Sequence, residues 1–272
     1  MARKALISTT DWAQDSGASI SVSVGAFESL LPASNMLDRR PQLVAQATGT
    51  SLAFTVALGA TRTLGLIHFQ NLLTDPTGTI RVQAGSYDSG TVNSWPTDTS
   101  GTYASALYSA LGRPRIFIPP SPVSASSITV TISAVATPLR IGFFGACEVW
   151  EAPDDLLIGS SMTILDGADI SQVPFGSTYV TEQGKRRRVD FGLPPLPDTR
   201  GSDDDYVDYY SEVFDLVLVN GKSTPVILAP FPDDIDTLER GAVWGLISTD
   251  QQFTNAFYGH HNITAFQITQ LI

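Results

Sequence analysis

Apolar and polar residues alternate with a period of two along several short segments in the first half of the chain. Clear examples lie at residues 19–24, 52–58 and 128–132, where Ile, Val, Leu or Phe alternates with Ser, Thr or Ala. This alternation is typical of strands with one buried face, so Ile20 and Val22 are expected to point inward. Several such strands, separated by turns rich in Gly and Pro, predict a β-sandwich or jelly roll.

The second half of the chain shows a different pattern. A basic strand is predicted within residues 184–191. Ser202, followed by three aspartates, is typical of a helix N-terminus, where acidic side chains interact favourably with the helix dipole. Apolar residues spaced three and four apart extend this helix over about 203–219, and Asn220-Gly221 is expected to end it. Three further strands are predicted, at 225–228, 242–247 and 263–268.

The charged residues divide the chain into two parts. Residues 1–152 carry nine basic and nine acidic side chains, whereas residues 153–272 carry seven basic and eighteen acidic ones. This change in composition predicts a domain boundary. The fold class expected is mainly β, with a β-sandwich or jelly roll at 1–152. A small β-sheet or split barrel with one helix is expected at 153–272.

The overall composition excludes several classes of function. Of the 272 residues, 43% are hydrophobic and 16% are charged, which is typical of a globular chain. The net charge of −11 argues against binding to nucleic acid, which requires a basic surface. No apolar stretch approaches the roughly 18 residues of a membrane span, so no membrane insertion is expected. The first residues contain no apolar segment, so no secretory signal is expected.

The residues predict no catalytic, cofactor or metal site. There is no Gly-x-Ser-x-Gly elbow, P-loop or calcium-loop spacing, although an unmarked pair of carboxylates is left open. Cys147 is the only cysteine, and its apolar neighbours predict a buried structural thiol. His260 and His261 are adjacent, so on a strand they would point to opposite faces and not share a metal ion. His68 follows an apolar run and is predicted to be an ordinary strand residue.

Two sets of residues are candidates for binding. The run Lys185, Arg186, Arg187 and Arg188 would place positive charge on both faces of a strand. One face could form an assembly interface with an acidic surface of a neighbouring subunit, or the run could mark a charged edge strand that discourages pairing. The second set contains aromatic residues near polar loops, which could contact a glycan or be buried. Its members are Trp95, Tyr87 and Tyr103.

Five segments of the first half occur in an order that resembles the galactose-binding-like, discoidin-type jelly rolls. They are Asn35–Asp38, Leu52–Gly59, Leu64–Asn71, Ile80–Gln83 and Ile141–Phe144. This resemblance implies a jelly-roll sandwich. The sequence Asn-Met-Leu-Asp-Arg-Arg-Pro, with Ala-Gln-Ala-Thr shortly after it, is also similar to minor tail proteins of tailed bacteriophages.

The second half resembles the belt domain of distal tail proteins from long-tailed siphophages. The matching segments, in order, are Arg188–Phe191, the helix from Asp203, Pro225–Leu228, Asp233-Asp234, Val243–Ile247 and Phe266–Ile268. In the usual distal tail protein the belt precedes its sandwich domain, whereas here the sandwich comes first.

Together, these resemblances imply a structural, non-enzymatic component of a bacteriophage tail tip or baseplate. It would be made in the cytoplasm of the bacterial host and reside in the virion tail. A ring of six copies, or alternatively three, would join the tail tube to hub and fibre proteins. The alternative function is a carbohydrate-binding module that contacts host glycans through the loops of the first domain.

Overall fold

The computed structural model describes residues 3–96, 104–133, 138–152, 160–172, 178–181, 185–193, 196–197, 209–250, 252–257, 260–263 and 265–271. The chain forms two compact units. Unit 1 contains Met1–Pro153 and Val226–Ala242, and unit 2 contains Asp154–Pro225 and Val243–Ile272. Residues 226–242 thus return to unit 1, whereas the sequence analysis placed them in a second domain. Among the described residues, no helix combines the length and the apolar character needed to cross a membrane.

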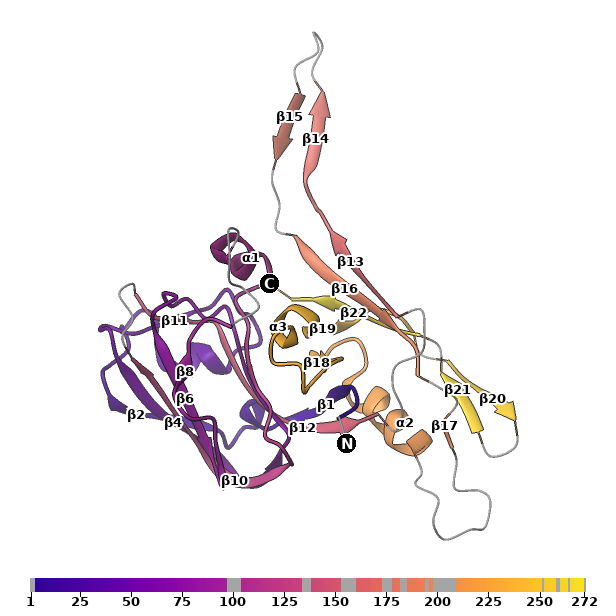
Figure 1. Cartoon of the computed structure of the whole chain (residues 1–272), viewed down its shortest axis with the longest axis horizontal. Coiled ribbons are helices and arrows are strands. Elements are labelled where there is room, and N and C mark those ends of the chain that lie inside the picture. The colour runs from indigo at the N-terminus through magenta and orange to yellow at the C-terminus, as the bar shows by residue number, and fades with distance from the viewer. Residues whose placement is uncertain are drawn as a thin grey trace. The chain divides into compact units, whose positions relative to one another are not determined.

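Unit 1 is a β-sandwich made of two antiparallel sheets (Figure 1). The first sheet has the order β2 (Ser19–Val24), β4 (Leu52–Leu64), β10 (Val123–Ser133), β6 (Thr79–Ala84) and β7 (Tyr87–Asp88), and β8 (Val92–Asn93) also pairs with β6. Within unit 1, the second sheet has the order β18 (Val226–Ala229), β1 (Leu6–Asp11), β12 (Phe143–Glu151), β5 (Leu66–Gln70) and β9 (Arg115–Phe117). A short pair is formed by β3 (Ala45–Gln46) and β11 (Arg140–Ile141).

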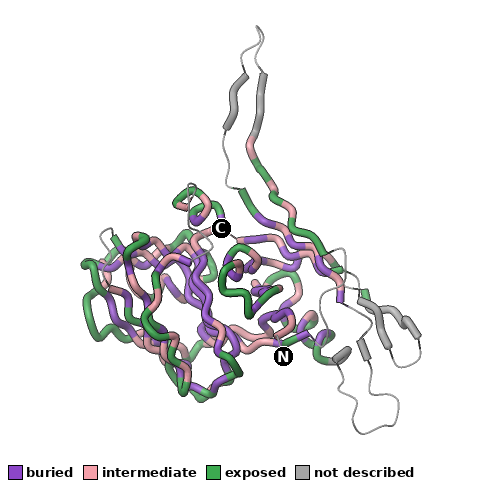
Figure 2. Tube along the Cα trace, viewed as in Figure 1, coloured by how far each residue is buried: buried purple, intermediate pink, exposed green. Residues whose placement is uncertain are grey.

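The hydrophobic core of unit 1 lies between its two sheets. Phe54 and Val130 pair across β4 and β10 and are fully buried, as are Phe69 and Phe144 from β5 and β12. The Phe69 and Phe144 rings meet edge to face, with centroids 5.2 Å apart. Buried residues recur along these strands in Figure 2. The mainly β fold class and its N-terminal β-sandwich, predicted from alternation in β4 and β10, are therefore confirmed.

Strand β2 differs from its predicted burial. The sequence pattern placed Ile20, Val22 and Val24 on an inward face, but Val22 and Val24 are exposed. Among the described strands, β2 lies at the end of its sheet and pairs with β4, with a register shift between Val22 and Val24. An irregular edge strand twists away from the facing sheet, and its alternating pattern then no longer corresponds to a buried face.

Unit 1 also contains short helices that the sequence analysis did not predict. They are the 3-10 helices η1 (Trp12–Gln14) and η2 (Ala33–Leu37) and the α-helices α1 (Ala104–Ala110) and α3 (Leu238–Gly241). At seven residues or fewer, these helices are too short to show a 3.6-residue period. The one helix expected within residues 153–272 is thus accompanied by short helices that the sequence pattern does not mark.

Unit 2 contains a sheet with the order β13 (Ser161–Leu165), β16 (Arg186–Phe191), β22 (Phe266–Gln270) and β19 (Val243–Ile247). A second pair contains β14 (Asp169–Gln172) and β15 (Thr178–Thr181), and a third group contains β17 (Leu196–Pro197), β21 (His260–Ile263) and β20 (Phe253–Phe257).

The predicted helix of this unit is α2, at Tyr209–Asn220. Its predicted start, at residues 203–208, lies outside the described residues. Gly221 has a φ of +51° and donates to the carbonyl of Val217, which confirms the predicted left-handed helix end.

Candidate functional site

A pocket of about 450 Å³ opens on unit 1. Its described lining comes from three segments that lie far apart in the sequence: the loop after β5, the loop after β8, and α1 with the turn that follows it. The lining residues are Leu73, Trp95, Ser105, Ala106, Tyr108, Ser109 and Arg113. This volume lies within the usual range of small-molecule pockets.

Trp95 and Tyr108 form the aromatic part of the pocket. Their ring centroids lie 4.8 Å apart at an angle of 40°. The Trp95 indole Nε1 donates to the carbonyl of Thr74, 3.1 Å away, and the Tyr108 hydroxyl donates to the carbonyl of Leu72, 3.0 Å away. Burial raises the pKa of Tyr108 well above its ordinary value, so this hydroxyl remains protonated. Tyr108 is buried, whereas Trp95 keeps part of its surface exposed.

Arg113 supplies the positive charge of the pocket. Its Nη1 donates to Oδ1 of Asn71, 2.9 Å away, and its Nη2 lies 3.2 Å from the Ser109 hydroxyl. Asn71 in turn donates through Nδ2 to the carbonyl of Pro41, 2.9 Å away. The guanidinium is therefore held in place by side chains from the loop after β5 and from α1, which reduces the entropy lost when it binds a ligand.

The backbone at Asn71 and Arg113 adopts an unusual conformation. Both residues have a positive φ, +52° and +49°, which is uncommon for residues other than glycine. The two segments are joined by backbone hydrogen bonds from Asn71 N to the carbonyl of Gly112 and from Leu72 N to that of Arg113. Strained positions of this kind persist only where the surrounding structure enforces them, and they occur often at binding sites.

The pocket therefore combines one partly exposed aromatic face with a fixed guanidinium and the hydroxyls of Ser105 and Ser109. The aromatic face offers an apolar stacking surface, and the guanidinium and hydroxyls donate or accept hydrogen bonds at its edge. Such a site suits a small ligand with one apolar face and several hydroxyl or carboxylate oxygens.

Of the three aromatic residues predicted as glycan contacts, the structure describes Trp95 and Tyr87. Trp95 lines the pocket, Tyr103 lies outside the described residues, and Tyr87 is absent from the described lining. The Tyr87 ring packs against the hydrophobic core of unit 1 instead. Neither Arg113 nor Asn71 was predicted as a binding residue, and Asn71 was noted only as the end of the jelly-roll segment Leu64–Asn71.

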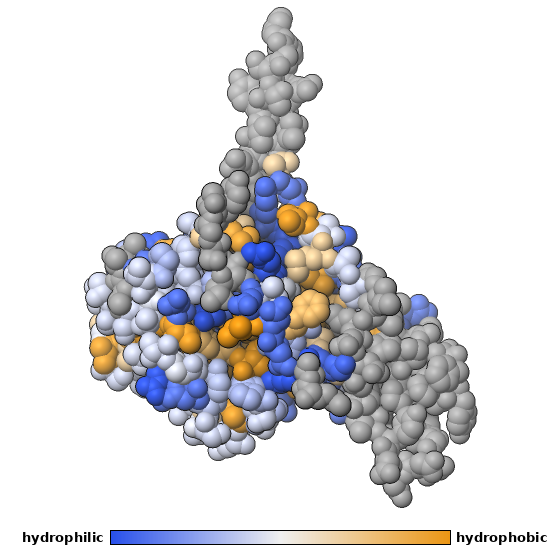
Figure 3. All heavy atoms as spheres, viewed as in Figure 1, coloured by the Kyte–Doolittle hydropathy of each residue, from blue (hydrophilic) through white to orange (hydrophobic). Residues whose placement is uncertain are grey.

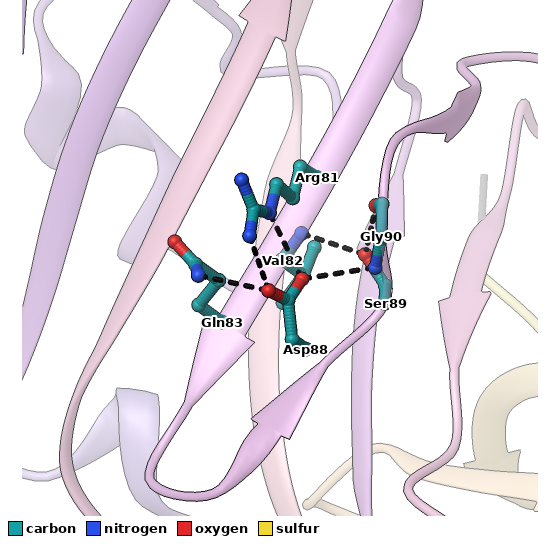
Figure 4. A network of polar contacts seen from close by, with 6 residues as sticks. All are labelled: Arg81, Val82, Gln83, Asp88, Ser89 and Gly90. Carbon is teal, nitrogen blue, oxygen red and sulfur yellow. Dashed lines mark hydrogen bonds and ion pairs between the residues drawn. The ribbon is translucent and has the colours of Figure 1, made fainter.

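Tyr87 lies in a hairpin held by its own polar network (Figure 4). Asp88 accepts hydrogen bonds from Arg81, from Nε2 of Gln83 at 3.0 Å, and from the backbone N of Gly90 at 2.9 Å. The Arg81 guanidinium is the main cause that lowers the pKa of Asp88 below its ordinary value. These contacts satisfy the carboxylate within the hairpin, which therefore has a structural role.

Asp88→Asn is expected to lower the melting temperature at neutral pH, because the ionised carboxylate favours the folded state. Because the pKa of Asp88 is lower in the folded state than its ordinary value of 3.8, the ionised carboxylate stabilises the folded state fully above pH 3.8. This stabilisation is lost as the pH falls from 3.8 through the pKa of the folded state. The difference between wild type and Asp88→Asn should therefore shrink below pH 3.8. Thermal melts of both proteins from acid to neutral pH measure this, and a constant difference would contradict it.

The basic run of β16 has Arg187 on one face of the strand and Arg186 and Arg188 on the other, but the face that carries Arg187 is buried. Arg187 is buried on the same face as Val189 and Phe191, and its backbone N and Nε donate to the side-chain oxygen of Gln270. β16 lies between β13 and β22, so it is not the charged edge strand that was considered. Lys185 pairs with Asp166, and Arg188 pairs with Asp190, whereas Arg186 is exposed.

A second cluster of polar groups lies on neighbouring strands of unit 1. Asp11, His68 and Cys147 place one ligand-type atom each within 4.8 Å of the others. Burial raises the pKa of Asp11 to about 7, lowers that of His68 to about 3, and raises that of Cys147 well above its ordinary value. His68 is a strand residue and Cys147 is buried, as predicted. The sequence analysis expected no metal site and did not bring these three residues together.

Comparisons with known proteins identify no family. No protein-family model matches the chain. No curated protein matches it either.

Several solved structures resemble about half of the chain. A family 32 carbohydrate-binding module from C. perfringens NanJ, in complex with galactose, is 15% identical with a TM-score of 0.39, over 52% of this chain and 99% of the module. Chitosan-binding module 1 from a Paenibacillus sp. IK-5 chitosanase/glucanase is 13% identical with a TM-score of 0.36, over 51% and 98%. A Ruminococcus gnavus GH29 fucosidase is 17% identical with a TM-score of 0.37, over 52% of this chain and 27% of the enzyme. At these values no residue role transfers, and the resemblance to phage tail proteins gains no support.

Proposed function

We propose that this chain binds carbohydrate, without catalysis, through the pocket lined by Trp95, Tyr108 and Arg113. The observation that carries the proposal is the combination of a partly exposed indole with a guanidinium that Asn71 and Ser109 hold in place. A sugar ring has an apolar face that can stack on the indole, and its hydroxyls lie at the ring edge, where Arg113 and the serines can reach them.

The fixed guanidinium favours particular arrangements of sugar oxygens. Arginine donates through a planar fork, which matches two adjacent oxygens better than a single one. Vicinal hydroxyls or the carboxylate of an acidic sugar both offer this arrangement. A glycan array that includes neutral and acidic sugars would identify the class, and its best ligand can then be titrated by calorimetry.

Trp95→Ala is expected to weaken binding of that ligand at least about tenfold, because the stacking surface is lost. Arg113→Lys should also weaken it, since lysine keeps the charge but lacks the fork. Tyr87→Phe is the matched control. It removes a hydroxyl from an aromatic residue outside the described pocket lining and should leave affinity unchanged. Wild-type protein that binds no glycan, or a Trp95→Ala variant that binds normally, would refute the proposal.

We propose an assembly role as a second candidate function, because unit 2 exposes apolar side chains. Phe214 and Leu218 are one turn apart on α2, and Met162 and Ile164 lie on one side of β13, at the end of its sheet. An edge strand with exposed apolar residues is prone to pair with another chain. The face in Figure 3 carries several separate hydrophobic patches among hydrophilic residues. A homo-oligomeric ring of a phage tail baseplate, with tail-tube, hub and fibre proteins as partners, is the assembly implied by the sequence resemblance.

Light scattering on the purified chain tests this second candidate. A discrete trimer or hexamer supports it, and Arg186→Glu/Arg188→Glu should then shift the mass towards the monomer. These two residues lie on the outward side of β16, so the fold should survive the change, which circular dichroism would check. A monomer at every concentration tested, with no ring in negative-stain images, would contradict self-assembly of the isolated chain.

A further inference from the structure

We propose that Asp11, His68 and Cys147 form a binding site for a zinc ion within unit 1. The backbone register places the three residues together. β12 lies between β1 and β5, Asp11 pairs with Cys147, and His68 pairs with Gly145. Residues two apart on a strand share a face, so all three side chains lie on the same side of this sheet. The other side carries Phe144 and the core of the sandwich.

The distances between the ligand atoms suit a single metal ion. A carboxylate oxygen of Asp11, an imidazole nitrogen of His68 and Sγ of Cys147 all lie within 4.8 Å of one another. Tetrahedral zinc, with bonds of about 2.0 to 2.3 Å, separates its ligand atoms by about 3.5 Å. Small side-chain rotations would bring the three atoms to that separation without moving the strands.

Gly145 provides the space in which these groups converge. A Cβ atom at this position would lie 2.2 Å from Nε2 of His68 and 3.0 Å from Oδ2 of Asp11. Any other residue would therefore collide with the imidazole. The absence of a side chain at Gly145 allows the imidazole and the carboxylate to approach each other over the strand.

Neighbouring groups hold two of the ligands in orientation. Oδ1 of Asp11 accepts hydrogen bonds from the backbone N of Ala146 at 2.9 Å and of Ala13 at 3.1 Å, and Oδ2 is the oxygen next to Gly145. Nδ1 of His68 lies 3.2 Å from the amide nitrogen of Gln70, and Nε2 of the same ring lies over Gly145. Such outer contacts are characteristic of metal-binding histidines.

The donor atoms favour zinc over calcium or magnesium. Calcium and magnesium take oxygen ligands, whereas a thiolate and an imidazole suit zinc and similar transition metals. Three protein ligands leave a fourth position for water. His68 and Cys147 are buried, and the partly exposed Asp11 provides the side from which an ion could enter.

Metal titration of the full chain, first freed of metal with a chelator and lacking a polyhistidine tag, tests this proposal. Zinc should bind at one ion per chain by mass spectrometry of the metal content. Cobalt(II) should give visible bands of tetrahedral coordination together with a near-ultraviolet thiolate charge-transfer band. Folded wild-type protein that binds neither ion stoichiometrically would overturn the proposal.

Cys147→Ser should abolish the charge-transfer band and weaken binding at least about tenfold. Asp11→Asn keeps an oxygen for the Ala146 and Ala13 hydrogen bonds, and it should weaken binding while the thiolate band remains, so the test survives if the first variant fails to fold. His260→Gln/His261→Gln is the control for the adjacent histidine pair and should bind as the wild type does. A charge-transfer band that persists in Cys147→Ser, or is lost only in this control, would overturn the assignment.

Discussion

Glu239→Ala is expected to lower the free energy of unfolding of unit 1 by about 3 to 5 kcal/mol, because it leaves a buried arginine without its counter-ion. Glu239 on α3 is fully buried, and Arg115 on β9 is 9% exposed. Oε1 of Glu239 accepts from Nη1 of Arg115 at 2.5 Å and from the backbone N of Ile116 at 3.3 Å. The pair anchors β9, which begins two residues after the pocket residue Arg113.

Urea denaturation measures this loss, with the wild type and the variant compared at the same pH. The matched control is Arg115→Met/Glu239→Met, which removes both charges. It should recover much of the lost stability, because an apolar pair of similar size can replace a buried ion pair at little net cost. If Glu239→Ala lowers the free energy of unfolding by less than about 1 kcal/mol, the Arg115 charge is solvated or compensated by other groups.

The sequence predicted those parts of the fold in which burial follows a regular period. Residues 54–58 of β4 and 128–133 of β10 alternate between buried and more exposed positions, because one face of each strand packs into the sandwich core. The same rule could have placed Arg187 inward, since it shares the period of Val189 and Phe191 on β16. Because arginine is charged, the side chain was predicted to lie on the surface, but it is buried and donates a hydrogen bond to Gln270.

The candidate sites were much harder to predict from the sequence. The pocket residues Trp95 and Arg113, and the Asn71 side chain that holds Arg113, come from separate loops, and the fold brings those loops together. Trp95 was found because large aromatic residues near polar loops are conspicuous. Asp11, His68 and Cys147 likewise come from three strands, and no local spacing in the sequence marks them as a set.

Gly142→Ala is expected to lower the free energy of unfolding by about 2 to 3 kcal/mol and to weaken glycan binding, although Gly142 is not among the residues that line the described pocket. A Cβ at Gly142 would lie 2.2 Å from the carbonyl oxygen of Pro41 and 2.8 Å from Cβ of Asn71. Because the Pro41 carbonyl belongs to the backbone, a Cβ at Gly142 would force the loop that contains Pro41 to move. Asn71 binds that same Pro41 carbonyl and holds the Arg113 guanidinium, so displacing either group loosens Arg113.

Calorimetric titration of the best glycan, alongside urea denaturation, measures both effects of Gly142→Ala. Gly49→Ala is the matched control, since a Cβ there would meet nothing within 4 Å. It should leave both stability and affinity nearly unchanged. If Gly142→Ala lowers stability while affinity stays at the wild-type value, the chain of contacts from Pro41 through Asn71 to Arg113 does not position the ligand. If the double variant Trp95→Ala/Gly142→Ala loses less affinity than the sum of the two single losses, the guanidinium and the indole act as one binding unit.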